Sequence, residues 1–203
     1  SLYSLILEPG TRLFDDVESG KTQPISDDLS ADMYEFAIDK LTQDGYSHYE
    51  ISNWARGDAF EARHNKIYWK NQDYLGVGAG AHSSLNGMRV ANTSLIENYI
   101  LRLTESRPEA NNAFPAAVET LKLDLFTTQQ ETMMLGMRLT KEGVSDFDFR
   151  DRFGAAIMDV FPKEVKRIID NKLAEWRAFP DGPHLVLTRR GVLLGNQVFQ
   201  EFV

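Results

Sequence analysis

In the first part of the chain, the pattern of apolar and polar positions predicts a strand, a helix and a second strand, in that order. Residues 1–7 are mostly apolar and are followed by a Pro-Gly turn, which predicts a buried strand. Residues 12–26 are polar and predict a loop, whereas apolar residues at helical spacing predict a helix over 27–44. The alternating run 46–54 predicts a second strand. This order predicts a βαβ unit with a parallel pair of strands.

The middle of the chain has a hairpin signal. A short strand is expected at 73–77, and a hairpin over 83–91, where Asn86-Gly87 suits a type I′ turn. A helix is expected at about 94–104. Residues 105–120 contain two prolines and two adjacent asparagines, and predict a connector.

From Thr127 onward the pattern is mainly helical. A capping-type sequence at 128–131 precedes a methionine-rich apolar face, which we assign to core packing. Further helical segments are expected within 144–169 and at 173–176, and 183–194 predicts a strand running into a last helix. Helices followed by a short strand and a helix suggest a small winged-helix-like module.

Composition narrows the function classes. The chain has 203 residues, no cysteine and a formal net charge of -8. The acidic balance disfavours nonspecific nucleic-acid binding, which needs clustered lysine and arginine. The longest apolar runs are far shorter than the roughly 18 residues of a membrane span. Without cysteine this chain cannot form disulfides, thiolate zinc sites or cysteine-held iron–sulfur clusters.

The densest chemistry lies between His64 and His82. His64 and Tyr68 are four residues apart and share a face if the segment is helical. The histidine could be an axial ligand of a heme iron, or a hydrogen-bonded histidine beside core aromatics. Gly76, Gly78 and Gly80 could approach a nucleotide or pack tightly against a neighbour, and they do not form the dinucleotide fingerprint.

Two other histidines are candidate site residues. His48 and Glu50 share a predicted strand face, which fits an acid–base pair or, more commonly, a structural hydrogen bond. His184 follows Pro183 in a predicted turn and is expected to be exposed.

Four motifs in order give a family resemblance. The motifs are Ser1-Leu2-Tyr3 with Glu8-Pro9-Gly10-Thr11, Tyr49-Glu50-Ile51-Ser52-Asn53, His64-Asn65-x-x-Tyr68-Trp69, and Tyr74-Leu75-Gly76-x-Gly78-x-Gly80-Ala81-His82. With these motifs in this order, the chain resembles the HemW-like branch of the oxygen-independent coproporphyrinogen III oxidase family, whose members are radical S-adenosylmethionine (SAM) proteins.

The resemblance implies an α/β fold made of two parts. The expected fold is the C-terminal part of a radical SAM partial (β/α) barrel, followed by a small, mainly helical, winged-helix-like domain. The implied domains are a barrel remnant at 1–105, a connector at 106–126 and a helical C-terminal domain of the HemN type at 127–203. The family's CxxxCxxC motif for a [4Fe–4S] cluster is absent, so the chain is interpreted as a C-terminal fragment, and its abrupt apolar start agrees.

The resemblance also implies site residues. His64 would be the heme iron ligand, and Asn65, Tyr68 and Trp69 would complete the heme site. The SAM pocket of the full-length protein would be lined in part by Ile6, Ala81 and His82.

The family includes heme chaperones and true oxidases. The resemblance favours a cytoplasmic heme chaperone that binds heme or a porphyrin and passes heme to an acceptor protein. The alternatives are an oxygen-independent coproporphyrinogen III oxidase, and a protein-interaction module in the C-terminal domain. Without cluster cysteines the fragment alone is expected to be inactive. Strand edges left open by truncation predict a dimer.

Overall fold

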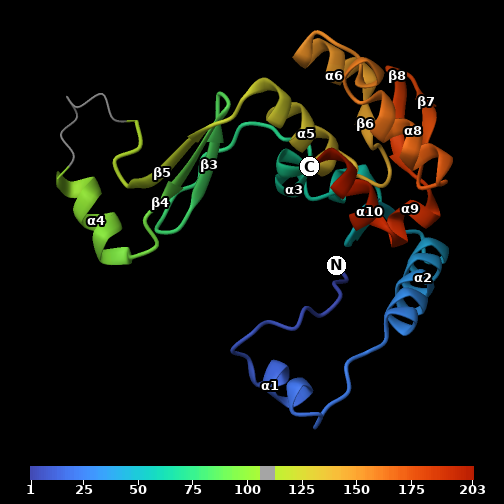
Figure 1. Ribbon diagram of the computed structural model, residues 1–203, viewed down its shortest axis with the longest axis horizontal. Helices are drawn as coiled ribbons and strands as arrows, with labels where there is room; N and C mark the ends of the chain where they lie inside the picture. The colour runs from blue at the N-terminus through green and yellow to red at the C-terminus, as the bar shows by residue number, and fades with distance from the viewer. Residues whose placement is uncertain (106–112) are drawn as a thin grey trace.

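A computed structural model describes residues 1–105 and 113–203 of the chain (Figure 1). Its helices and strands follow one another as α1 (Arg12–Glu18), α2 (Asp27–Gln43), β1 (Ser47–Glu50), β2 (Asn53–Ala55), a 3-10 turn (Asp58–Phe60), α3 (Arg63–Trp69), β3 (His82–Leu85), β4 (Met88–Asn92), α4 (Ile96–Glu105), β5 (Ala117–Lys122), α5 (Leu125–Gly136), β6 (Val144–Ser145), α6 (Asp146–Phe153), α7 (Ile157–Val160), α8 (Pro162–Asp170), β7 (Ala174–Phe179), β8 (Gly182–Leu187), α9 (Arg189–Leu193), α10 (Gly195–Phe199) and a last 3-10 turn (Gln200–Phe202).

All strand pairs among the described residues are antiparallel. They form a two-stranded sheet β1-β2, a three-stranded sheet β3-β4-β5 and a three-stranded sheet β6-β8-β7. The predicted βαβ unit with a parallel pair is therefore wrong for this chain. The run 46–54 folds into the β1-β2 hairpin instead of one strand, because the chain reverses at Ile51 and Ser52.

The predicted first strand is also wrong. Residues 1–7 have no regular structure, and Leu5 and Ile6 are 75% and 73% exposed. Among the described residues, the backbone of this segment is joined to the rest of the chain by a hydrogen bond from Leu2 N to Ser52 O at 2.9 Å. Strand structure needs a neighbouring strand to pair the backbone groups, and an apolar sequence alone does not supply one. The predicted loop at 12–26 contains α1, which Thr11 caps by accepting from Phe14 N.

Predictions that depended on local signals are confirmed. Helix α2 lies within one residue of the predicted 27–44, and its cap Ser26 accepts from Leu29 N. The β3-β4 hairpin turns at Asn86 and Gly87, whose φ angles of 50° and 73° fit a type I′ turn. Helix α4 is found where a helix was expected.

The second half of the described chain has one continuous core. Helices α5, α6 and α8 bury apolar side chains together with the β6-β8-β7 sheet and α10 (Figure 1). Fully buried members of this core include Met133, Met137, Ile157, Val165, Leu185 and Val198. The methionine-rich face of α5 is thus core, as predicted.

Several boundaries in this half differ from the prediction. Helix α5 begins at Leu125 because Asp124 caps it by accepting from Thr127 N, three residues before the predicted capping sequence. Residues 173–176 were expected to be helical, but β7 begins at Ala174 and pairs with β8. Part of the predicted connector forms β5, and its residues 106–112 lie outside the described part of the chain.

Helix α3 lies where the two halves meet. In Figure 1 the β3-β4-β5 sheet and α4 extend to one side, while the β1-β2 hairpin and α3 lie near the C-terminal elements. Helix α3 also contacts α5. Among the described helices, none is long and apolar enough to cross a membrane.

Candidate functional site

The four predicted heme-site residues lie on one short helix and form two pairs that face different ways. His64 and Tyr68 are one turn apart on α3, and so are Asn65 and Trp69. The Tyr68 hydroxyl hydrogen-bonds Nε2 of His64 at 3.1 Å, and their rings meet edge to face at 4.9 Å. His64 is exposed. The structure therefore presents an accessible imidazole beside a tyrosine.

His64 and Tyr68, the outer pair of α3, lie beside an aromatic and apolar surface. The ring of Tyr68 lies 4.7 Å from that of Tyr74, edge to face. Leu75 and Val77, which follow Tyr74, are both largely exposed. A flat, largely apolar ring system such as a porphyrin suits such a surface, and a neutral imidazole nitrogen is a ligand for its iron. The outer pair thus fits heme, provided that the Tyr68 hydroxyl leaves Nε2.

Asn65 and Trp69, the inner pair of α3, hold the helix against the rest of the protein. Asn65 Nδ2 donates to Glu50 Oε1 at 3.2 Å. The Arg138 guanidinium lies 5.4 Å from the Trp69 ring centroid and 4.3 Å from that of Phe199. These contacts direct Asn65 and Trp69 toward the protein, away from the outer pair.

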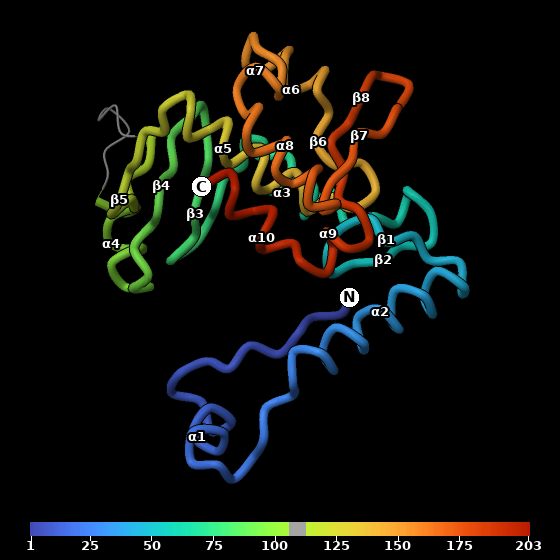
Figure 2. The backbone as a smooth tube through the Cα atoms, turned by 45° about the vertical axis from the view of Figure 1, so that its right-hand side comes forward, coloured from blue at the N-terminus to red at the C-terminus, as the bar shows by residue number. Residues whose placement is uncertain are grey.

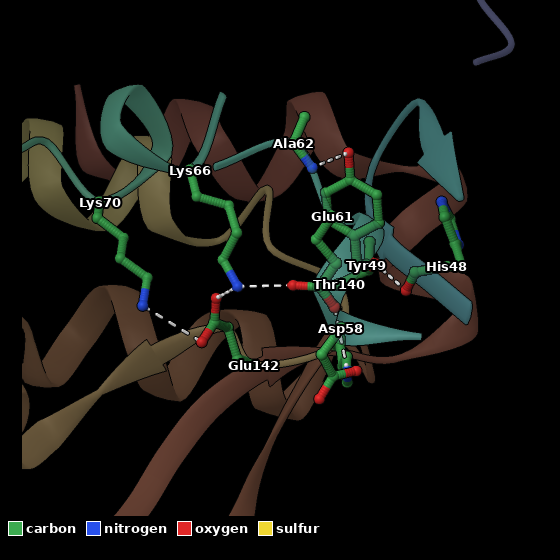
Figure 3. Close-up of polar contacts among 10 residues, drawn as sticks. His48, Tyr49, Asp58, Glu61, Ala62, Lys66, Lys70, Thr140 and Glu142 are labelled. Carbon is green, nitrogen blue, oxygen red and sulfur yellow. Dashed lines mark hydrogen bonds and ion pairs between the residues drawn. The ribbon is translucent and has the colours of Figure 1, made fainter. Parts of the chain in front are cut away.

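A set of ion pairs, which sequence reasoning missed, joins α3 to the loop after α5 (Figure 3). Lys66 Nζ lies 2.7 Å from a Glu61 carboxylate oxygen and 2.8 Å from Glu142 Oε1. Lys70, one turn further along α3, pairs with the other Glu142 oxygen at 3.3 Å. Lys141 also pairs with Glu61, at 3.1 Å. Lysines four apart on a helix were the only signal available in the sequence.

The pKa values of this cluster give its pH dependence. Burial alone would raise the pKa of Glu142, but Lys66 and Lys70 bring it below its usual 4.5. Burial alone would lower the pKa of Lys66, but Glu142 and Glu61 raise it above its usual 10.5. The depressed Glu142 pKa adds stability that is present above pH 4.5 and is lost as pH falls through the folded-state value. The raised Lys66 pKa adds stability that is lost as pH rises through its folded-state value.

We expect Glu142→Gln to lower the free energy of unfolding by about 1 kcal/mol at neutral pH, because the glutamine keeps the shape but loses both ion pairs. Urea unfolding at about pH 7 and about pH 3 measures the difference, which should shrink in acid. The control is Glu175→Gln, which removes the exposed pair with Arg177 and should change stability by less than about 0.5 kcal/mol. An equal loss at both pH values would contradict the role given to the Glu142 charge.

His48 and Glu50 do not form an acid–base pair. Nε2 of His48 lies 3.0 Å from Ile51 O, and its ring stacks on Trp54 with centroids 4.2 Å apart. Burial lowers the pKa of His48. Glu50 accepts instead from Asn53 and Asn65. The structural interpretation is confirmed.

The glycine-rich run packs against its own neighbours. The amides of Gly76, Gly78 and Gly80 donate to Ser83 Oγ, Tyr99 Oη and Thr93 O, respectively. A Cβ on Gly76 would lie 2.1 Å from the carbonyl oxygen of His82, so only glycine fits there. Because these three donors are used internally, the run favours tight packing over a nucleotide cradle.

The residues expected near SAM are not brought together. His82 begins β3 and is exposed, and Ala81 precedes it. Ile6 lies in the exposed first segment, which is apart from β3 in both backbone views (Figure 2). These three residues alone do not form a SAM pocket in this chain.

His184 is buried, which corrects the expectation that it is exposed. It is 7% exposed, and its ring stacks on Phe179 with centroids 4.2 Å apart. Its Nδ1 donates to Glu142 O at 2.7 Å, and its Nε2 lies 3.0 Å from an Asp181 oxygen. The hydrogen bond from His184 holds the pKa of Asp181 below its usual range. His184 thus fixes the loop that carries Glu142. Its burial depends on the β7-β8 hairpin, whose turn is marked in the sequence by Pro180-Asp181-Gly182.

Within residues 1–105 and 113–203, no group of three or more histidine, cysteine, aspartate or glutamate residues could hold a metal ion. A metal bound inside a macrocycle needs only one or two protein ligands. His64 is compatible with that kind of ligation.

Comparisons with known proteins agree on a family. The HemN C-terminal domain family matches residues 129–194. The chain is 34% identical to the protein named heme chaperone HemW from Lactococcus lactis over 204 aligned residues, which cover 100% of this chain and 50% of that protein. The heme chaperone HemW of Bacillus subtilis is also 34% identical, with the same coverage.

A solved structure shares the fold. Coproporphyrinogen III oxidase (HemN) from Escherichia coli, described as a radical SAM enzyme, matches with a TM-score of 0.61 and 18% identity. The match covers 88% of this chain and 42% of that one. The chain spans about half the length of the curated relatives named above. In its mixed α/β fold, and in residues 129–194 that the HemN C-terminal domain family matches, the chain is similar to HemN and HemW proteins.

Proposed function

We propose that this chain is the heme-presenting part of a heme chaperone, with His64 as the iron ligand. The observation that carries the proposal is the exposed His64 imidazole, which is held by Tyr68 at 3.1 Å beside an aromatic surface. The names of the 34% identical relatives support the choice of heme as cargo.

Each residue of the outer face has a role in this proposal. Heme supplies the iron that His64 ligates and the flat ring that lies on the surface near Tyr74. Tyr68 holds Nε2 of His64 while the site is empty of cargo, and its hydroxyl becomes free when Nε2 turns to iron. A ligand on an open surface suits a carrier, because the cargo must leave for an acceptor protein.

We expect His64→Ala to weaken hemin binding at least about tenfold, because iron ligation contributes more than the roughly 1.4 kcal/mol that a factor of ten requires. Titration followed at the Soret band measures the affinity and the change of ligation. The matched control is His82→Ala, which removes an exposed histidine from β3 and should leave the affinity unchanged. Unchanged binding by His64→Ala, or equal losses in both variants, would remove His64 as the ligand.

The oxidase alternative concerns the whole protein. The structural likeness to coproporphyrinogen III oxidase supports it at the level of the fold. Cluster chemistry would need cysteines that this chain does not contain. Conversion of coproporphyrinogen III by a longer form of the protein that carries the cluster cysteines would favour the oxidase over the chaperone.

We also propose that the chain divides into a barrel remnant at 1–105, a connector at 106–126 and a C-terminal domain at 127–203. For the C-terminal domain we propose a winged-helix-like fold. The order α5, β6, α6, α7, α8, β7, β8 supports this proposal, as does the β6-β8-β7 sheet with its β7-β8 hairpin. The strands predicted at 1–7 and 73–77 are not formed among the described residues, where 73–77 has only an isolated bridge from Tyr74 to Ser84. Pull-down with residues 127–203 would test whether this part alone binds an acceptor protein.

A further inference from the structure

We infer that Glu50 is a positioning residue for His64 and acts through Asn65. The inference deepens the proposed heme site and rests on it. Glu50 lies on β1, outside α3. Its carboxylate receives the side chain of the residue that follows His64.

Helix α3 needs such support because it is short and lacks a side-chain cap. It has seven residues, and Ala62 at its N-cap makes no side-chain hydrogen bond. Two adjacent residues of β1 hold its start instead. The Tyr49 hydroxyl accepts from Ala62 N at 3.2 Å (Figure 3), and Glu50 Oε1 accepts from Asn65 Nδ2 at 3.2 Å. A helix this short gains little stability from its own hydrogen bonds, so these contacts set its position.

Glu50 is a firm anchor. It is 2% exposed, and its Oε1 accepts from both Asn53 and Asn65. Its other oxygen, Oε2, is buried without a hydrogen-bond partner among the described residues. Removing a hydrogen-bond donor from a buried carboxylate destabilises the protein, because the desolvation cost of the charged oxygen is then no longer offset by that hydrogen bond. The bond to Asn65 therefore resists rotation of α3.

The rotation of α3 decides where His64 points. Asn65 and Trp69 lie one turn apart on the inner face, one bound to Glu50 and the other stacked against Arg138. With both held, the neighbouring pair His64 and Tyr68 is directed outward. If the Asn65 bond is lost, the inner face of α3 keeps only the Trp69 contact at its C-terminal end. The Tyr49 hydrogen bond to Ala62 N and the ion pairs of Lys66 still hold the helix, but the imidazole is less firmly directed.

A role exchange between the two partners tests this inference. Asn65→Asp places two carboxylates against each other and removes the donor. In the double variant Asn65→Asp with Glu50→Gln, the glutamine Nε2 takes the position of Oε1 and donates to the aspartate. Asn53, which donates to that position in the unmodified chain, then has to turn its amide so that its oxygen accepts the second N–H of the glutamine. The control Asn171→Asp adds the same charge at the exposed C-cap of α8.

We expect Asn65→Asp to weaken hemin binding about tenfold and to alter the Soret band, and the double variant to return within roughly threefold of the unmodified chain with its original band. Without hemin, amide hydrogen exchange over residues 63–69 should rise in Asn65→Asp and fall again in the double variant. Circular dichroism separates these effects from unfolding. If Asn65→Asp had the Soret band and the hemin affinity of the unmodified chain, the inference would be overturned. The same holds if the double variant folded but bound hemin no more tightly than Asn65→Asp.

The two proposals fail in different ways. If His64→Ala leaves the Soret titration unchanged, heme ligation by His64 is lost. The hydrogen-exchange comparison would still measure whether Glu50 fixes α3, because it needs no heme. If His64→Ala abolishes binding while exchange over 63–69 is unaffected by Asn65→Asp, the ligand stands and the positioning role of Glu50 is overturned.

Discussion

Replacing Gly191 by alanine is expected to lower the free energy of unfolding by about 3 kcal/mol or more. A Cβ at this position would lie 1.8 Å from the carbonyl oxygen of Leu173. That oxygen cannot move away, because Thr188 N donates to it at 3.0 Å, and the Thr188 hydroxyl donates to Lys172 O. Helix α9 must therefore shift away from the start of β7. Urea unfolding followed by circular dichroism measures the loss.

Gly195→Ala is the matched control for this prediction. It also lies in a short C-terminal helix, but its Cβ would meet the end of the Phe199 ring at 3.0 Å. A ring end can move by a few tenths of an ångström, so the expected cost is about 1 kcal/mol or less. If the two variants unfolded at the same urea concentration, the close approach of α9 to Leu173 would be refuted.

The parts of the fold that could be predicted are those with short-range signals. Ser26 caps α2 within its own sequence, and Asn86-Gly87 forms the turn of its own hairpin. Thr188 likewise caps α9 by accepting from Gly191 N. Each signal and its effect are separated by only a few residues, so the sequence contains both.

The errors concern elements whose structure depends on pairing with another segment. Residues 1–7 are apolar but have no strand beside them among the described residues. Residues 173–176 have a helical pattern, yet Ala174–Phe179 pair with β8 across the Pro180-Asp181 turn and form β7. His184 is buried because its ring stacks on Phe179 in the partner strand and its Nδ1 binds Glu142 O in a remote loop. Tertiary pairing overrode local propensity at each of these places.

The site shows the same division. The four-residue spacing of His64 and Tyr68 predicted their shared face, and the structure confirms it. The partners that orient α3 come from two other segments, Glu50 from β1 and Arg138 and Glu142 from the loop after α5. Adjacent residues on a helix point in different directions. The sequence therefore indicates that Asn65 and Trp69, which follow His64 and Tyr68 by one position each, lie on a different face of α3 from His64.

The second large effect is expected for Phe149→Ala, which should cost about 3–5 kcal/mol. Phe149 is 2% exposed, and its ring contacts Phe153 and Phe161 with centroids at 4.7 and 6.3 Å. It also lines a cavity of about 340 Å³ that extends to Trp69 on α3. Truncation would enlarge this cavity, because the surrounding core relaxes only in part.

The loss should extend to α3, because Arg138 and Glu142 hold that helix from the same part of the chain. We expect hydrogen exchange over residues 63–69 to rise together with exchange in α6, and urea transitions of both regions to coincide. The control Phe147→Ala removes a neighbouring ring that is 59% exposed and should cost less than about 1 kcal/mol. If exchange rose in α6 alone, α3 would be held mainly by the β1-β2 hairpin. The heme-presenting helix would then be independent of the C-terminal core.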